Sequence, residues 1–325
     1  MKKLKISSIW NHGDFKHLLL PLIIKNFFNI EIEWTSPRKC DLLILGPYNI
    51  HKFYKKFLNK FILNKSNYLK LMFDDFEKEI IFRKNKPITV FYCGENERPT
   101  EILSDYQISC DFNILDEKNY LRIPSWKEYI DWSHIGLIKP KGVLNARRFG
   151  SHYRIYDLVN PQGVEFLSKN KKICCFFTLL NEPRKTFINL LKKEFVVDGF
   201  GPAFNKNISN HNSSNFFKKD VLKNYFANFC PENSMYPGWY TEKIIDAFVG
   251  KTLPISWSDE NIKQDFNPKS FINLSNFYPN KMDILMEILK DDNLLLNFSK
   301  EPLLLSEPNL DSEINFVKKI LSNFI

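Results

Sequence analysis

Short apolar runs alternate with stretches of helical spacing along the first half of the chain. The first apolar run, at residues 5–10, is followed by a helical stretch at 14–28. Further strand-like runs cover residues 30–34, 41–46, 88–92 and 106–109. Because short apolar strands separated by helices form βαβ units, this pattern predicts a mostly parallel sheet.

The second half shows the same alternation. Its strand-like runs cover residues 172–177, 195–198 and 253–257, and its helical segments cover 184–194 and 242–248. The sequence therefore predicts an α/β protein with two facing halves, a first domain over residues 1–155 and a second over 156–325. Ligands of such sheets bind beyond the carboxyl ends of the strands.

Two polar segments interrupt this pattern. Residues 147–163 are rich in charged residues, Tyr and Gly, and we interpret them as the linker between the halves. Residues 205–214 are almost entirely polar, which is typical of a surface loop.

The composition is that of a globular protein with ample core material. Of 325 residues, 44% are hydrophobic and 30 are Phe, which argues against a disordered chain. The net charge of +9 suits an acidic lipid, an acidic glycan or a diphosphate. We find no nucleic-acid-binding motif and expect no nucleic-acid partner.

No segment has the pattern of a signal peptide or of a membrane span. The most apolar stretch, residues 18–28, is interrupted by Pro21, Lys25 and Asn26. It is shorter than the roughly 20 residues that cross a bilayer. We therefore expect a cytoplasmic protein, and we expect its six cysteines, which form no CxxC pair, to be buried thiols.

Two cations stand at expected helix beginnings in the second half. Thr241 is placed as the helix cap, so that Lys243 falls in the first turn, where a cation opposes the helix dipole. A bound phosphate would explain this lysine; the alternative is a surface lysine without a partner. Arg184 begins the other helix, and its planar fork suits a diphosphate, although most such arginines are solvated.

Glu95 follows the strand at residues 88–92 and lies in a glycine turn. Catalytic groups of α/β proteins are often found at such strand ends, and a carboxylate there can take a proton from a hydroxyl. The alternatives are that Glu95 caps the turn or pairs with Arg98.

Several of these segments, taken in order, resemble the α-1,3-fucosyltransferase family, above all the bacterial members that make Lewis-type antigens on lipopolysaccharide. The resemblance rests on Asn233, on Tyr240-Thr241-Glu242-Lys243 and on the run at residues 265–271. It extends to residues 91–99, 120–124 and 181–184, and so covers most of the chain.

The resemblance implies a GT-B fold with two Rossmann-like domains and GDP-β-L-fucose as the donor, bound mainly by the second. It implies inverting transfer of fucose to a hydroxyl of an N-acetyllactosamine-type glycan. Glu95 would be the general base, Arg184 and Lys243 would hold the diphosphate, and Glu242 would lie near the fucose or the ribose. No Asp-x-Asp metal motif is present, so we expect no required metal and leave stimulation by a divalent ion open.

The donor site departs from the family pattern in two places. Asn233 matches as a polar contact, but Pro231 replaces the usual Phe before it. Trp239-Tyr240 stands where the family has Tyr-Val, and we count both residues among the donor contacts. The alternatives are therefore a binding protein that has lost catalysis, or a fucosyltransferase with α-1,4 or other regiochemistry.

Two amphipathic segments raise the question of membrane contact. Phe and Lys each recur every four residues over 51–65, which is typical either of a basic helix on anionic lipid or of a domain helix with a buried Phe stripe. The segment at 314–325 has the same options: packing on the first domain or touching a membrane. We expect any membrane contact to be peripheral.

Overall fold

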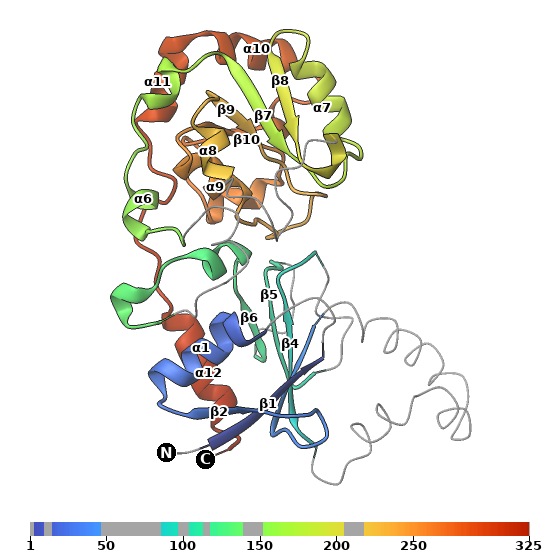
Figure 1. Cartoon of the computed structure of the whole chain (residues 1–325), viewed down its shortest axis with the longest axis vertical. Coiled ribbons are helices and arrows are strands. Elements are labelled where there is room, and N and C mark those ends of the chain that lie inside the picture. Colours follow the sequence, from blue (N-terminus) through green and yellow to red (C-terminus); the bar gives the residue numbers. More distant parts are fainter. Residues whose placement is uncertain are drawn as a thin grey trace, which may run out of the picture. The chain divides into compact units, whose positions relative to one another are not determined.

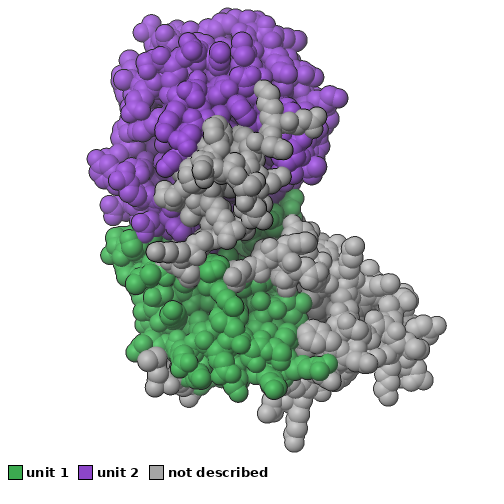
Figure 2. Space-filling model, in the orientation of Figure 1, with its two compact units in different colours: residues 1–123, 132–140, 310–325 green, residues 124–131, 141–309 purple. Residues whose placement is uncertain are grey.

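The computed structural model describes residues 3–9, 15–46, 86–96, 104–112, 118–138, 152–204 and 218–324 (Figure 1). They form two compact units (Figure 2). Unit 1 comprises residues 1–123, 132–140 and 310–325, and unit 2 comprises 124–131 and 141–309. Each unit contains one parallel sheet, which confirms the predicted α/β class.

Unit 1 is built on a six-stranded sheet with the order β2-β1-β3-β4-β5-β6. Its strands are β1 (Lys3–Ile9), β2 (Glu31–Trp34), β3 (Leu42–Leu45), β4 (Ile88–Cys93), β5 (Tyr106–Ser109) and β6 (Tyr120–Arg122). All five strand pairs are parallel. The strands at the centre are apolar on both faces, as expected for a sheet covered on both sides.

Two helices of unit 1 come from opposite ends of the chain. α1 (Leu19–Phe27) contacts α12 (Asp311–Leu321), and α12 also contacts β6. The apolar side of α12 is buried, including Val317 and Ile320. Asn323, just beyond α12, donates a hydrogen bond to the Tyr106 hydroxyl at 2.8 Å. Of the two options that the sequence left open for this segment, the helix packs on the first unit.

Unit 2 is built on a five-stranded sheet with the order β11-β10-β9-β7-β8. Its strands are β7 (Lys172–Phe176), β8 (Val196–Phe200), β9 (Ala227–Phe229), β10 (Leu253–Ser256) and β11 (Ile272–Asn273). Counted along the chain, this is the order 2-1-3-4-5, which unit 1 also shows in its first five strands. In such a sheet the strand order reverses at a switch point, here between β7 and β9, where ligands characteristically bind.

One face of this sheet packs on three helices. These are α7 (Arg184–Leu191), α10 (Met282–Lys290) and α11 (Asp292–Ser299). The odd-numbered residues of β7, β9 and β10 join side chains of these helices in one buried cluster, as the two-residue period of a strand requires. On the same unit α8 (Lys218–Leu222) contacts α9 (Lys243–Val249), which contacts β10.

The two units do not follow the predicted division at residue 155. Residues 152–155 group with unit 2, as does the segment at 124–131, whereas residues 310–324 group with unit 1. The expected linker contains a short helix, α6 (Ile155–Val159). The segments at 51–65 and 205–214 lie outside the described residues.

All six cysteines are buried free thiols, as predicted. Within the part of the chain that the structure describes, no helix is long and apolar enough to cross a membrane.

Candidate functional site

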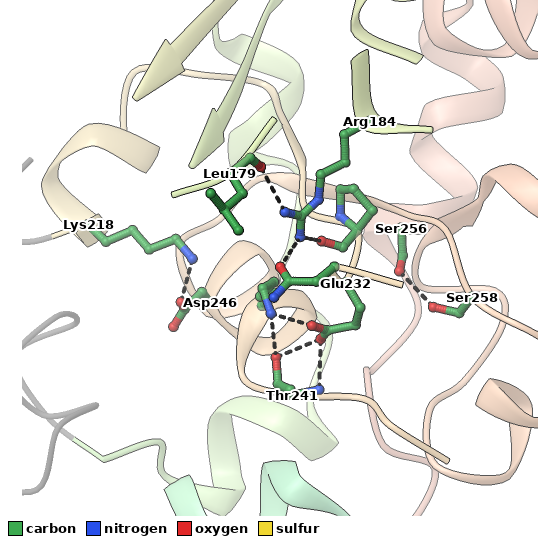
Figure 3. Close-up of polar contacts among 11 residues, drawn as sticks. Leu179, Arg184, Lys218, Glu232, Thr241, Asp246, Ser256 and Ser258 are labelled. Carbon is green, nitrogen blue, oxygen red and sulfur yellow. Dashed lines mark hydrogen bonds and ion pairs between the residues drawn. The ribbon is translucent and has the colours of Figure 1, made fainter. Parts of the chain in front are cut away.

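A cluster of buried polar and charged residues lies at the carboxyl ends of β7 and β9 (Figure 3). The chain leaves β7 through residues 177–183 and enters α7 at Arg184, and it leaves β9 through 230–242 and enters α9 at Lys243. β7 and β9 are parallel neighbours, so both loops start at the same edge of the sheet. This edge is the switch point of unit 2.

Arg184 joins these two loops. It is only 2% exposed. Its Nη1 donates to the carbonyl of Leu179 at 3.1 Å, and its Nη2 donates to the carbonyl of Pro231 at 2.9 Å and to Oδ1 of Asn233 at 2.6 Å. The guanidinium carbon lies 4.3 Å from the centre of the Phe177 ring. Two of the predicted donor-site residues, Arg184 and Asn233, are therefore in direct contact.

The guanidinium of Arg184 keeps unused hydrogen-bonding capacity. Burial lowers its pKa, while the charge of Glu232 acts in the opposite direction, and an arginine stays protonated under such conditions. Its Nε is buried and has no hydrogen-bond partner among the described residues. A buried unpaired N–H costs about 1–3 kcal/mol, which an acceptor on a ligand would recover.

Glu232 is a buried carboxylate of the cluster, 5% exposed. Its Oε1 accepts hydrogen bonds from the backbone N–H of Thr241 at 2.9 Å and from the Thr241 hydroxyl at 2.6 Å. Its Oε2 forms an ion pair with the ammonium of Lys243. One carboxylate thus ties the loop after β9 to the beginning of α9.

Lys243 is the first residue of α9, and its side chain is 20% exposed. Besides the pair with Glu232, its Nζ donates to the Thr241 hydroxyl at 3.0 Å and lies 5.8 Å from the centre of the Trp239 ring. Burial disfavours the charged form, but the carboxylates of Glu232 and Glu242 outweigh it and raise the pKa of Lys243. An ammonium has three N–H donors, and two are used by partners within the described residues.

The helix start differs from the prediction. Thr241 does not cap α9: the N-cap position is Glu242, which makes no capping bond with its side chain, and Thr241 bonds Glu232 instead. The charge of Lys243 is balanced by Glu232, so the lysine needs no external anion to be stable there. Sequence reasoning missed Glu232, although it directly precedes Asn233 in the segment that carries the resemblance.

The aromatic pair before α9 is buried, with Trp239 at 4% and Tyr240 at 2% exposure. The Tyr240 hydroxyl donates to the carboxylate of Asp259. Burial, with Asp259 adding to it, raises the pKa of Tyr240 far above its usual value. The phenol therefore stays neutral, and its hydroxyl is committed to a partner within the protein.

A second buried ion pair, also missed from the sequence, lies one turn further along α9. Asp246 accepts from Nζ of Lys218 at 2.6 Å and from the hydroxyl of Tyr153. Asp246 is 1% exposed, and burial raises its pKa although Lys218 opposes this. Lys218 also lies 5.0 Å from the centre of the Phe176 ring. The pair anchors α9 to α8 and to the segment around Tyr153.

Glu95 belongs to unit 1, whereas the other six predicted site residues belong to unit 2. It directly follows β4 and Gly94 and is partly exposed. Its backbone N–H donates to Sγ of Cys93 at 3.3 Å, and its carbonyl accepts from the thiol of Cys110 at 3.7 Å. These contacts fix the backbone of the turn at the carboxyl end of β4.

Side chains that commonly hold metal ions are not clustered in the described ranges. Within them, no group of three or more His, Cys, Asp or Glu side chains is placed to hold a metal ion. The need for a metal or its absence stays a prediction.

Comparison with solved structures identifies the fold. The structure "Crystal Structure of alpha1,3-Fucosyltransferase with GDP-fucose" superposes with a TM-score of 0.65 at 22% identity, over 100% of this chain and 92% of that one. Another, "Crystal Structure of alpha1,3-Fucosyltransferase", superposes with a TM-score of 0.64 at 24% identity, over 99% and 90%. The chain has the GT-B fold of glycosyltransferases, with two Rossmann-like units, as the resemblance implied.

The sequence comparisons find similarity to fucosyltransferases. Residues 166–300 match the model of glycosyltransferase family 10 (fucosyltransferase), C-terminal part. The alpha-(1,3)-fucosyltransferase FucT of Helicobacter pylori is 31% identical over 205 residues, and the 4-galactosyl-N-acetylglucosaminide 3-alpha-L-fucosyltransferase 9 of Homo sapiens is 27% identical over 145. Residues 166–300 are thus similar to the C-terminal part of this fucosyltransferase family, in agreement with the resemblance seen in the sequence.

These sequence matches have a limited extent. The Helicobacter pylori match covers 58% of this chain and 41% of that protein, and the human match covers 43% and 39%. The chain thus spans about two fifths of the length of these curated relatives.

Proposed function

We propose that the protein transfers L-fucose from GDP-β-L-fucose to a hydroxyl of an N-acetyllactosamine-type glycan, with inversion and formation of an α-1,3 linkage. The observation that carries this proposal is the convergence of Arg184 and Lys243 on the adjacent residues Asn233 and Glu232 at the switch point of unit 2. The names of the relatives and the GDP-fucose bound in a structural neighbour support the choice of donor.

Arg184 and Lys243 stabilise the leaving group in this proposal. When the bond between fucose C1 and the phosphate oxygen breaks, GDP takes up negative charge. Positioned cations that meet this charge contribute several kcal/mol to lowering the barrier. The unpartnered Nε of Arg184 and the third N–H of Lys243 supply hydrogen bonds for phosphate oxygens.

Asn233 and Glu242 contact the rest of the donor. The Asn233 carbonyl oxygen accepts from Arg184, so in this proposal its amide nitrogen supplies the N–H donors for the ligand. Glu242 accepts from hydroxyl groups of the fucose or the ribose. Trp239 and Tyr240 contribute apolar ring surface, because the Tyr240 hydroxyl is occupied by Asp259.

Glu95 is the general base of the proposed reaction. It takes the proton of the acceptor hydroxyl while the acceptor oxygen forms its bond to fucose C1 and GDP departs. An alcohol is a poor nucleophile until a carboxylate removes its proton. Support comes from the position of Glu95, partly exposed at the carboxyl end of a parallel strand.

The direct experiment is incubation of the protein with GDP-fucose and an N-acetyllactosamine acceptor, with GDP release and product mass as readouts. The expected product is heavier by one fucose, and NMR of the purified product distinguishes an α-1,3 from an α-1,4 bond. Binding of GDP-fucose without any product, across type 1 and type 2 acceptors, favours the alternative of a sugar-nucleotide-binding protein without catalysis.

We also propose that transfer needs no resident metal, because Arg184 and Lys243 supply the positive charge that a metal would provide at the diphosphate. Activity should survive excess chelator. Complete loss with EDTA and recovery with a divalent cation would contradict this part.

A further inference from the structure

We propose that Glu232 is a positioning residue that fixes the Lys243 ammonium and the Thr241 backbone at the place where the donor diphosphate is held. This inference rests on the proposed function, because it assigns a further residue to the same site. It concerns a side chain that the sequence did not single out.

The Glu232 carboxylate contacts residues at the beginning of α9 with both of its oxygens. Glu232 belongs to the loop after β9, whereas its partners stand at the beginning of α9. Both of its oxygens are engaged: Oε1 by two donors of Thr241, at 2.9 and 2.6 Å, and Oε2 by Lys243. Its 5% exposure leaves little access to water that could replace these partners.

The arrangement leaves Lys243 available to a ligand. A lysine side chain is long and flexible, and ordering it when a ligand binds weakens the observed affinity. Here Glu232 and Thr241 order it beforehand and use two of its three N–H donors. The third has no partner in the part of the chain that the structure describes, and the side chain is 20% exposed. A group fixed in this way binds a phosphate oxygen at lower entropic cost.

Glu232 also stabilises the protonated form of Lys243. Four titratable groups act on the ammonium or respond to it: Glu232 and Glu242 favour its charge, Arg184 opposes it, and the Cys230 thiol lies within electrostatic reach. Of the two carboxylates, Glu232 forms the ion pair. Burial and Arg184 both lower the pKa of Lys243, and the charge of Glu232 counteracts them. Without that charge the pKa of Lys243 falls, and the ammonium loses its proton at a lower pH.

The test is calorimetric titration of the full chain with GDP between pH 7 and about pH 11.5, on the native protein and on Glu232→Gln. The range extends this far because the pKa of the native Lys243 is raised above its usual value. The amide keeps an acceptor for Thr241 but removes the charge next to Lys243. We expect at least about tenfold weaker GDP binding and an alkaline decline that begins about one pH unit lower, because the variant lacks the carboxylate that does most to raise the pKa of Lys243.

Asp246→Asn is the matched control, since it removes another buried carboxylate that pairs with a lysine, here Asp246 of α9 with Lys218 of α8. If Glu232 served stability alone, both variants would melt earlier and neither would shift the pH profile of GDP binding. An unshifted profile in Glu232→Gln, or an equal shift in Asp246→Asn, overturns the proposal.

Glu232→Asp covers the case in which Glu232→Gln does not fold. It keeps the charge with a shorter reach, so we expect weaker binding of GDP with an alkaline decline near that of the native protein. A decline shifted as far as one pH unit in Glu232→Asp would contradict the assignment. Failure of the proposed function is seen separately: the native protein would bind GDP without transferring fucose.

Discussion

The two units share the strand order 2-1-3-4-5 but differ in the chemistry at the carboxyl edge of their sheets. In unit 2 this edge holds buried charges in pairs, Lys243 with Glu232 and Lys218 with Asp246. In unit 1 the described part of the edge includes contacts between neutral groups.

Tyr120 is an example of the neutral contacts in unit 1. Its hydroxyl donates to the carbonyl of Asp111 at 2.5 Å, and burial raises its pKa far above the usual value. Thiols of Cys93 and Cys110 bond the Glu95 carbonyl. A shared fold therefore supplies the location, and the side chains at the strand ends decide the chemistry. Buried cations suit a diphosphate, and a partly exposed carboxylate at a strand end suits a sugar hydroxyl.

Glu95→Gln should have the largest effect on turnover, because the substitution should impair catalysis alone. We expect the turnover number to fall about 100- to 10,000-fold, the usual contribution of a general base. GDP-fucose affinity, measured by calorimetry, should be nearly unchanged. Glu31→Gln, an exposed carboxylate of the same unit, serves as control and should leave turnover intact. Loss of GDP-fucose binding in Glu95→Gln would contradict the assignment of Glu95 as the general base.

Arg184→Ala should impair both binding and turnover, in contrast to the Glu95 variant. It removes the guanidinium that joins the two loops of unit 2 and stabilises the leaving group. We expect turnover to fall at least about 100-fold. The neighbouring residue provides the control: Lys185→Ala removes an exposed cation of α7 and should change little. Near-normal rates in Arg184→Ala would refute the diphosphate site.

Asp246→Asn should affect stability more than turnover. It leaves Lys218 without its buried countercharge, and the expected loss is about 1–3 kcal/mol of unfolding free energy. Urea denaturation followed by circular dichroism measures this loss. Tyr153→Phe removes only one hydrogen bond to the same carboxylate and should cost less. A larger loss of unfolding free energy in Tyr153→Phe than in Asp246→Asn would show that the ion pair contributes little to stability.

Tyr240→Phe should have the smallest effect. In our proposal the Tyr240 ring contacts the donor, whereas its hydroxyl bonds Asp259. Turnover should therefore change by no more than about threefold, and the free energy of unfolding should fall by about 1 kcal/mol. A large rise in KM for GDP-fucose at unchanged stability would assign the Tyr240 hydroxyl to the donor instead. Steady-state kinetics and thermal melts on the same preparation separate the two cases.

The apolar pattern predicted the longer elements of both sheets because each buried strand is a continuous run of hydrophobic residues. It missed β9, which has only three residues and carries the buried Asn228 at its centre. It also missed the helices α10 and α11. The division into units could not be predicted, because α12 returns to the first unit from the far end of the chain.

Site residues could be predicted where the local sequence marks them. Contacts between residues that are distant in the sequence could not be predicted. Arg184 and Lys243 could be named because each lies at a helix beginning. The partners of Asp246 could not, because Lys218 is 28 positions away and Tyr153 is 93. Glu232 is closer to Lys243, 11 positions away, but pairing across that distance depends on how the loop after β9 folds back.

If Arg184 and Lys243 hold the diphosphate, the protein should distinguish GDP from GMP, which lacks the β-phosphate. Calorimetry should show that the native protein binds GDP at least about tenfold more tightly than GMP, because the β-phosphate adds a charge that both cations can contact. In the double variant Arg184→Ala/Lys243→Ala this preference should vanish. A double variant that still binds GDP more tightly than GMP by the native ratio would contradict the account.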